Sequence, residues 1–146
     1  MFRVNRIRVA PMKAKSGLCL SLLLFSLLLS LPSSAEDAAA GLIGFWQDKD
    51  QPVVVEMKLV DDKVQGMVAS NSDKPNTVGK HLFRDLIHDA GTGQWSGRIY
   101  VLKLGAEKNV VVVMQGKDQF LMTVKVGLLS KKVLWNRVES PAANSH

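Results

Sequence analysis

The sequence is 146 residues long, with 19 lysines and arginines, 13 aspartates and glutamates and a single cysteine. This length allows one domain with one hydrophobic core. Five of the basic residues precede Glu36 and no acidic residue does, which leaves 14 basic against 13 acidic residues, a formal charge of +1. This balance excludes the broad basic surface of a nucleic-acid-binding protein. The remaining basic run, Lys131-Lys132, is interpreted as a solvated strand end.

Residues 1–35 have the pattern of a secretory signal peptide. A basic start is followed by a leucine-rich run from Leu18 to Leu31, and small residues up to Ala35 provide a cleavage site. The run is short for a bilayer span, although an uncleaved anchor helix is the alternative. The start codon is either Met1 or Met12. We expect cleavage near Ala35, a periplasmic or secreted protein, and no membrane span in the mature chain.

Cys19 is the only cysteine and belongs to this leader. It precedes most of the apolar run, whereas the cysteine of a lipoprotein anchor follows such a run. We therefore expect a mature chain without lipid anchor, disulfide or thiolate metal site. Core packing alone must then stabilise the fold.

The rest of the chain divides into an alanine-rich spacer at residues 36–41, one domain at 42–139 and a loose polar tail at 140–146. Short stretches rich in β-branched residues recur through the domain, and turn residues separate them, as is typical of antiparallel strands. In the first of these stretches, Val53, Val55, Met57 and Leu59 share one face. The expected strands are 44–46, 52–60, 63–70, 94–101, 109–114, 119–126 and 131–138.

The segment from Lys80 to Ala90 has an ambiguous pattern. Its apolar residues recur at helical spacing, so it fits either a short helix or a strand with irregular burial. We favour a strand and a loop, because all neighbouring segments are predicted to be strands. The polar residues of this segment are His81, Asp85, His88 and Asp89. They would form a face suited to metal binding only if the segment were a helix. We therefore expect no metal site.

The stretch GTGQWSGRIY, residues 91–100, contains three glycines within seven residues. A phosphate-binding loop lies between a strand and a helix, whereas these glycines precede a strand. We therefore interpret Gly91-Thr92-Gly93 as a turn. Gly97 lies inside the strand, where a glycine permits a bend or the close approach of a neighbouring strand.

These elements predict an all-β fold of seven or eight short antiparallel strands, without alternating helices. A sandwich or a small barrel fits this pattern. Closure into a barrel would protect the edges of apolar strands such as Asn109–Met114.

Two motifs at opposite ends of the domain indicate the type of barrel. Gly44-Phe45-Trp46 and Trp135-Asn136-Arg137 resemble the lipocalin and wider calycin pattern, in which a late arginine packs on the tryptophan of an early G-x-W. Cation–π packing of a planar guanidinium on an indole gives a physical reason for the pair. The resemblance implies a calycin-like barrel in which Arg137 covers Trp46.

The chain as a whole resembles the bacterial family named domain of unknown function 2147. The matching stretches are GLIGFWQ, VVVEMKLV, GTGQWSGRIY and VGLLSKKVLWNRV, which lie between Gly41 and Val138. The resemblance implies a secreted calycin-like β-barrel without an established activity. This chain lacks the cysteine pair of many members between Glu56 and Val68. It also has Val101-Leu102 and Gly105-Ala106-Glu107 where members often have Asp-Pro and a Gly-Lys-Thr-Tyr turn.

Three residues are candidate ligand contacts. Glu56 lies on the same strand face as Lys58, so we expect it to be exposed to solvent. If the apolar face of this strand pointed outward instead, Glu56 would lie in the barrel interior, and burial would raise its pKa. Arg98 and Tyr100 lie opposite Trp95 on their strand and either line a barrel mouth or coat the outside.

Four residues are expected to be structural: Trp46, Trp95 and Trp135 as core residues and Arg137 stacked on Trp46. No Gly-x-Ser-x-Gly elbow or other nucleophile arrangement is visible, so we assign no catalytic residues and no cofactor.

These features predict a non-enzymatic, lipocalin-like module that binds a small apolar or amphipathic ligand, such as a lipid fragment. The alternative is a structural or interaction protein of the cell envelope, with a solid core and an apolar surface for an envelope protein partner. Small barrels are often filled by their own side chains. A third hypothesis is an envelope hydrolase, which would depend on Glu56, His81 and His88.

Overall fold

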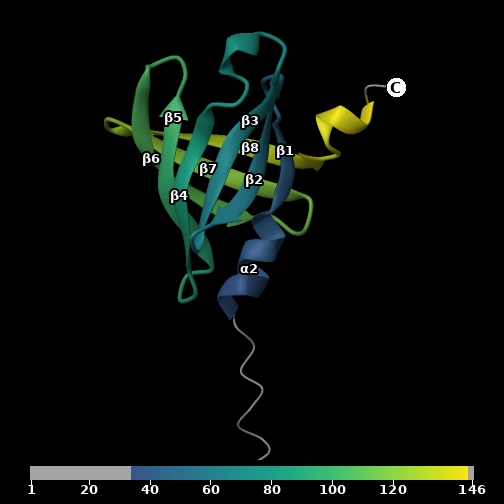
Figure 1. Cartoon of the computed structure of the whole chain (residues 1–146). Helices are drawn as coiled ribbons and strands as arrows, with labels where there is room; N and C mark the ends of the chain where they lie inside the picture. Colours follow the sequence, from purple (N-terminus) through teal and green to yellow (C-terminus); the bar gives the residue numbers. More distant parts are fainter. Residues whose placement is uncertain (1–33, 145–146) are drawn as a thin grey trace, which may run out of the picture. The chain divides into compact units, whose positions relative to one another are not determined.

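The computed structural model describes residues 34–144, which form a closed antiparallel barrel of eight strands (Figure 1). Each strand pairs with the next in sequence, and β8 pairs with β1 to close the barrel. The predicted all-β barrel of seven or eight strands is confirmed. The strands are β1 (Gly44–Asp48), β2 (Val53–Val60), β3 (Lys63–Asn71), β4 (His81–Asp89), β5 (Gln94–Val101), β6 (Ala106–Met114), β7 (Gln119–Val126) and β8 (Leu129–Val138).

The leader falls largely outside the described residues, together with Cys19 and both candidate start methionines. Ala35, the expected cleavage position, lies in the first turn of a helix, α2 (Ser34–Leu42). The segment expected as a spacer, residues 36–41, lies within this helix. Alanines favour a helix, and this one buries Ala39 and Leu42 against the barrel. No helix in residues 34–144 is long and apolar enough to cross a membrane.

The two remaining short helices lie in loops. The polar loop between β3 and β4 contains a 3-10 turn, η2 (Pro75–Thr77), which is stabilised by the buried pair Asn71 and Thr77. A second 3-10 turn, η3 (Pro141–Asn144), follows β8. The tail that we expected to be loose therefore has local helical structure in its first half.

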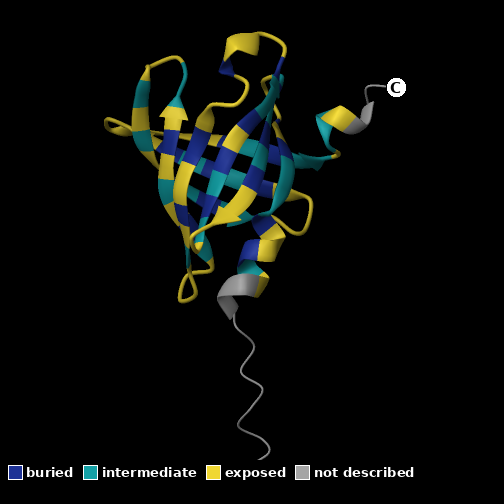
Figure 2. Ribbon diagram, in the orientation of Figure 1, coloured by how far each residue is buried: buried dark blue, intermediate teal, exposed yellow. Residues whose placement is uncertain are grey.

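Alternation along the strands places the apolar faces inside the barrel (Figure 2). On β2 the side chains of Val53, Val55 and Met57 are buried, as expected. Leu59 is 44 % exposed, contrary to the expected face, because it lies at the end of the hairpin beside the Asp61–Asp62 turn.

The ambiguous segment is strand β4, and a bulge explains its pattern. Asp85 has a φ of 53°, and the register with β5 shifts between Arg84 and Ile87. The extra residue of a bulge changes which side chains point inward. Phe83 and Leu86 are therefore both buried. A second register shift, with β3 between His81 and Phe83, accompanies the burial of Leu82 next to Phe83. The resulting spacing resembles that of a helix. The favoured strand interpretation is confirmed.

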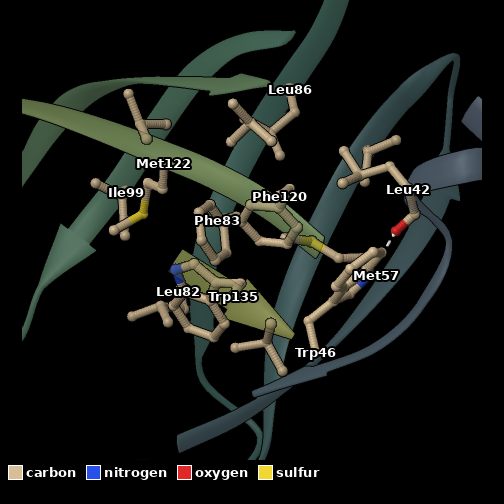
Figure 3. Close-up of a cluster of buried hydrophobic side chains, with 14 of the residues drawn as sticks. Leu42, Trp46, Met57, Leu82, Phe83, Leu86, Ile99, Phe120, Met122 and Trp135 are labelled. Carbon is tan, nitrogen blue, oxygen red and sulfur yellow. Dashed lines mark hydrogen bonds between the residues drawn. The ribbon is translucent and has the colours of Figure 1, made fainter. Parts of the chain in front are cut away.

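Large aromatic residues fill one half of the barrel (Figure 3). Phe120 stacks on Trp135 with ring centroids 5.7 Å apart and contacts the edge of Trp46 at 4.8 Å. Phe83 lies edge-on to Trp135 at 5.5 Å. These rings fill the half of the barrel next to α2 with residues that are wholly or almost wholly buried. The expected burial of all three tryptophans, including Trp95, is confirmed.

Arg137 closes this end of the barrel. Its guanidinium lies 4.2 Å from the centroid of the Trp46 ring, as the G-x-W resemblance implied. It donates hydrogen bonds to the carbonyl oxygens of Gly41 at 2.6 Å, Ile43 at 2.8 Å and Lys117 at 3.0 Å. A Cβ on Gly44 would lie 2.8 Å from the Arg137 Nη1 atom, and Gly44 has a φ of +127°. The positive φ of Gly44 and the short distance to Arg137 Nη1 both require a glycine at this position of the motif.

Candidate functional site

The other half of the barrel is not filled. A cavity of about 120 Å³ opens between the ends of β1, β5, β7 and β8, away from α2. Its inner walls come from aliphatic and methionine side chains, which are smaller than the rings of the closed half and so leave space. The apolar lining consists mainly of Val53, Leu82, Ile99, Met122, Val124 and Val133.

One residue of the cavity wall has an unpartnered hydrogen-bond donor. Trp135 is 1 % exposed and lines the cavity. Its Nε1 atom is the only buried side-chain nitrogen or oxygen without a hydrogen-bond partner among the described residues. By contrast, Trp46 Nε1 donates to the Leu42 carbonyl oxygen at 2.9 Å. Figure 3 shows the two indole nitrogens pointing apart, with that of Trp135 on the side of Leu82 and Ile99.

A buried donor without a partner costs about 1–3 kcal/mol, and such groups are rare in native proteins. Trp135 cannot turn away, because its ring is stacked on Phe120 and packed against Phe83, which lies edge-on to it. The unpaired N–H lies on the side of the cavity-lining Leu82 and Ile99, where a hydrogen-bond acceptor that reached it would be stabilised.

Asp48 lies beside Trp135 in the register of β1 with β8 and also lines the cavity. It is 6 % exposed. Its carboxylate accepts hydrogen bonds from the Asp50 backbone N–H at 2.8 Å and from Gln51 Nε2 at 3.4 Å. Burial raises the pKa of Asp48 above its ordinary value of 3.8, with a smaller contribution from the charge of Asp50, while the backbone hydrogen bonds and Lys131 oppose the rise.

This raised pKa predicts a pH dependence of stability. Because the folded state holds the proton of Asp48 more tightly than the unfolded state, its contribution to stability is largest below pH 3.8 and is lost as the pH rises through the folded-state pKa. Asp48→Asn retains an oxygen for the Asp50 N–H and has no charge. We expect the variant to gain stability relative to the wild type between acidic and neutral pH, as measured by urea unfolding at a series of pH values. A constant difference between the two proteins would contradict this prediction.

The structure does not bring the three candidate ligand contacts together. Glu56 lies on the outer face of β2 and pairs with Lys58 at 3.0 Å. Arg98 lies on the outer face of β5 and pairs with Glu107 at 3.3 Å. Tyr100 alone lines the cavity, at its rim. The inward orientation of Glu56 is excluded because the apolar face of β2 is the buried one.

The candidate metal and hydrolase residues do not converge on one point. His81 and His88 lie near opposite ends of β4, because the segment is a strand. His88 packs against the Trp95 ring at 5.0 Å, and Asp85 is engaged by Gln65 at 3.1 Å. Residues 34–144 contain no group of three or more histidines, cysteines or acidic residues placed to hold a metal ion.

A second hollow, of about 670 Å³, lies at the closed end between α2, the β4–β5 and β6–β7 turns and Arg137. It is a wide surface depression. Its wall contains no unpartnered buried polar side-chain atom in the part of the chain that the structure describes. The cavity at the open end is therefore the candidate site.

Sequence reasoning misses two features of this site, the presence of Asp48 and the unpaired N–H of Trp135. Asp48 could have been found, because it lies two residues after the inward-facing Trp46 on the same strand face. The unpaired state of Trp135 depends on the packing of four strands and has no signal in the sequence.

The fold and cavity place this protein in the class of small up-and-down β-barrels with an internal apolar site. No family model matches the chain, and no curated protein or solved structure matches it closely enough to indicate a relationship.

Proposed function

We propose that this protein is a non-enzymatic, calycin-like binding module. Its ligand is small and mainly apolar, carries one hydrogen-bond acceptor, and enters the open end of the barrel with that acceptor first. The observation that carries the proposal is an apolar cavity lined by Trp135, whose buried N–H has no hydrogen-bond partner. An apolar pocket with few polar groups that fix orientation is the usual form of a small-molecule site.

The cavity limits the size of the buried part of the ligand. An apolar cavity of about 150 Å³ holds a benzene molecule, and this one measures about 120 Å³. The buried part is therefore about the size of one small ring or a short acyl chain. A longer apolar tail would extend past Tyr100 and Lys131 at the rim, as expected for a fragment of an amphipathic molecule. The cavity favours binding over the alternative of a solid-core interaction protein.

The proposal includes a family and a cellular compartment for the protein. The packing of Arg137 on Trp46 in a closed barrel supports a place among the calycins and in the domain of unknown function 2147 family. The signal-like pattern of residues 1–35 supports a secreted or periplasmic location.

Matched ligands test the acceptor directly. Benzaldehyde carries a carbonyl acceptor and toluene has a similar size without one. We expect calorimetry to show tighter binding of benzaldehyde to the wild type. Trp135→Phe removes the N–H and should weaken benzaldehyde binding by about 2- to 10-fold more than toluene binding, the range given by one hydrogen bond.

The control variant is Trp46→Phe, which loses an indole N–H already bonded to Leu42. It should change the binding of both compounds equally. Failure of the wild type to bind either compound would overturn the proposed function. Equal loss of both compounds in Trp135→Phe would overturn the role of the acceptor and leave only apolar binding.

A further inference from the structure

The open end of the barrel carries apolar side chains that no part of the core requires. Leu128 is fully exposed at the turn between β7 and β8, and Leu129 is 77 % exposed beside it. Leu104 is 51 % exposed in the β5–β6 turn. Figure 2 shows these turns as exposed tips around the end where the cavity opens. The apolar tip is defined here as Leu104, Val126, Leu128 and Leu129.

Turn geometry does not explain the leucines. Gly127 has a φ of +62° and gives the turn its left-handed residue, and no atom lies within 4 Å of the position that a Cβ would take there. Turns of this kind ordinarily carry polar residues such as asparagine, aspartate or serine. Val126 and Leu129 pair across the hairpin beyond the buried part of the sheet. The side chains therefore project into solvent at a position where polar residues would fold equally well.

Lysines flank the apolar tip in the sequence. Lys103 adjoins Leu104, and Lys125, Lys131 and Lys132 flank the β7–β8 turn. None of these four lysines forms an ion pair with any residue that the structure describes. The interpretation of Lys131-Lys132 as only a solvated strand end does not account for this grouping.

The opposite end of the barrel has the opposite charge. Its turns and the strand residues next to them carry Asp61, Asp62, Asp89 and Asp118 against Lys63 and Lys117, and Asp118 pairs with Arg137 at 3.6 Å. The two other loops at the open end, residues 49–52 and 72–80, hold three lysines against two aspartates. The lysines therefore gather at the leucine-tipped mouth of the described barrel, whereas aspartates outnumber lysines in the turns of the closed end.

We propose that the open end docks on an anionic lipid bilayer, with the leucines of the apolar tip inserted and the lysines at the level of the lipid phosphates. Exposed apolar side chains flanked by lysines are the composition of an interfacial membrane contact. Protein interfaces are depleted of lysine, and a second copy of this chain would bring two basic ends together. The docked orientation turns the cavity mouth towards the bilayer. The inference does not depend on which ligand, if any, the cavity binds.

Vesicle sedimentation tests the docking. The protein, purified after export and processing, is mixed with vesicles of 30 % phosphatidylglycerol in phosphatidylcholine (about one anionic lipid in three) or of phosphatidylcholine alone. We expect binding to the anionic vesicles, at least about tenfold weaker binding to the neutral ones, and weakening by added salt. The double variant Leu128→Ser/Leu129→Ser should lose at least about tenfold of the binding to anionic vesicles, while Lys125→Glu/Lys132→Glu should lose the preference for them.

The matched control is Leu59→Ser/Val60→Ser, which removes two exposed apolar residues beside the acidic Asp61–Asp62 turn. It should bind vesicles as the wild type does. Urea unfolding confirms that each variant is folded. Absent binding to anionic vesicles, or unchanged binding in the Leu128 and Leu129 variant, would overturn the proposal. Leucine-dependent dimerisation or protein capture without vesicle binding would also overturn it, in favour of a protein partner.

Discussion

Gly97→Ala is expected to destabilise the barrel by about 3 kcal/mol, as is typical when a side chain is forced into a packed site. A Cβ at this position would lie 2.6 Å from the Arg84 carbonyl oxygen and 2.8 Å from that of Asp85. Both obstacles are backbone atoms of the β4 bulge, so no side-chain rotation relieves the contact. The measurement is urea unfolding of the variant and the wild type, followed by a probe of secondary structure.

The bulge is also held from its other side. Asp85 accepts a hydrogen bond from Gln65 Nε2 at 3.1 Å and donates its backbone N–H to Gln65 Oε1 at 3.1 Å. A shift of the bulge away from residue 97 would break this reciprocal pair. Relief of the clash therefore requires the loss of contacts between β3, β4 and β5 together.

A matched alanine substitution separates the clash from the general effect of replacing glycine. Gly41 lies in α2 with no atom within 4 Å of its Cβ position, so Gly41→Ala should be neutral or stabilise the helix by up to about 1 kcal/mol. If Gly97→Ala and Gly41→Ala had the same stability, the bulge would have to be free to move, and our account of Gly97 would be wrong.

The sequence predicts the barrel because the apolar pattern of the strands and the turn residues between them indicate the same fold. Alternating apolar residues on β2, β5 and β7 assign the inner faces, and glycine and aspartate turns separate the strands. The β4 segment is ambiguous for a definite reason. One residue with positive φ, Asp85, changes the phase of burial along the strand, and no two-residue period can describe a strand that changes phase. The helix α2 was missed because its stability depends on burial of Ala39 and Leu42 against strands distant in sequence.

The candidate site is less predictable than the fold. Glu56 and Arg98 are candidate ligand contacts in the sequence because they are charged residues on predicted strands. Both lie on the outer face of the barrel and form ion pairs there. The cavity arises from a difference in side-chain volume between two halves of the interior. That difference depends on which residues from different strands share one level of the barrel, and this register is set by long-range pairing. Trp135 is an example, because the sequence predicts its burial but does not predict that its indole N–H lacks a hydrogen-bond partner.

Arg137→Ala is the second large effect that we expect, a loss of about 3 kcal/mol. Hydrogen bonds from a charged donor contribute about 1.5–3 kcal/mol each before allowance for exposure and overlap. Arg137 donates three of them, to Gly41, Ile43 and Lys117, and its side chain is 30 % exposed. Its removal leaves those carbonyl oxygens without this donor and uncovers the Trp46 ring. Urea unfolding measures the loss.

Two controls assign this effect to the shape of the guanidinium. Arg137→Lys keeps the charge without the planar fork and should recover only part of the stability. Arg84→Ala removes an exposed arginine that pairs with Glu107 at 3.4 Å on the outer face, and it should cost no more than about 1 kcal/mol. Equal stability of Arg137→Ala and Arg84→Ala would mean that Arg137 does not hold the closed end together.

Hydrogen exchange and NMR locate where the stability of Arg137→Ala is lost. Arg137 connects the α2–β1 link, β8 and the β6–β7 turn, so the last turn of α2 should lose protection first, at the Ile43 N–H that bonds to Ala39. The Trp46 indole N–H, which bonds to Leu42, should exchange faster as well. The cavity at the open end lies beyond the aromatic rings and should keep its affinity for benzaldehyde while the barrel remains folded. A loss of affinity equal to that of Trp135→Phe would show that the two ends of the barrel are coupled.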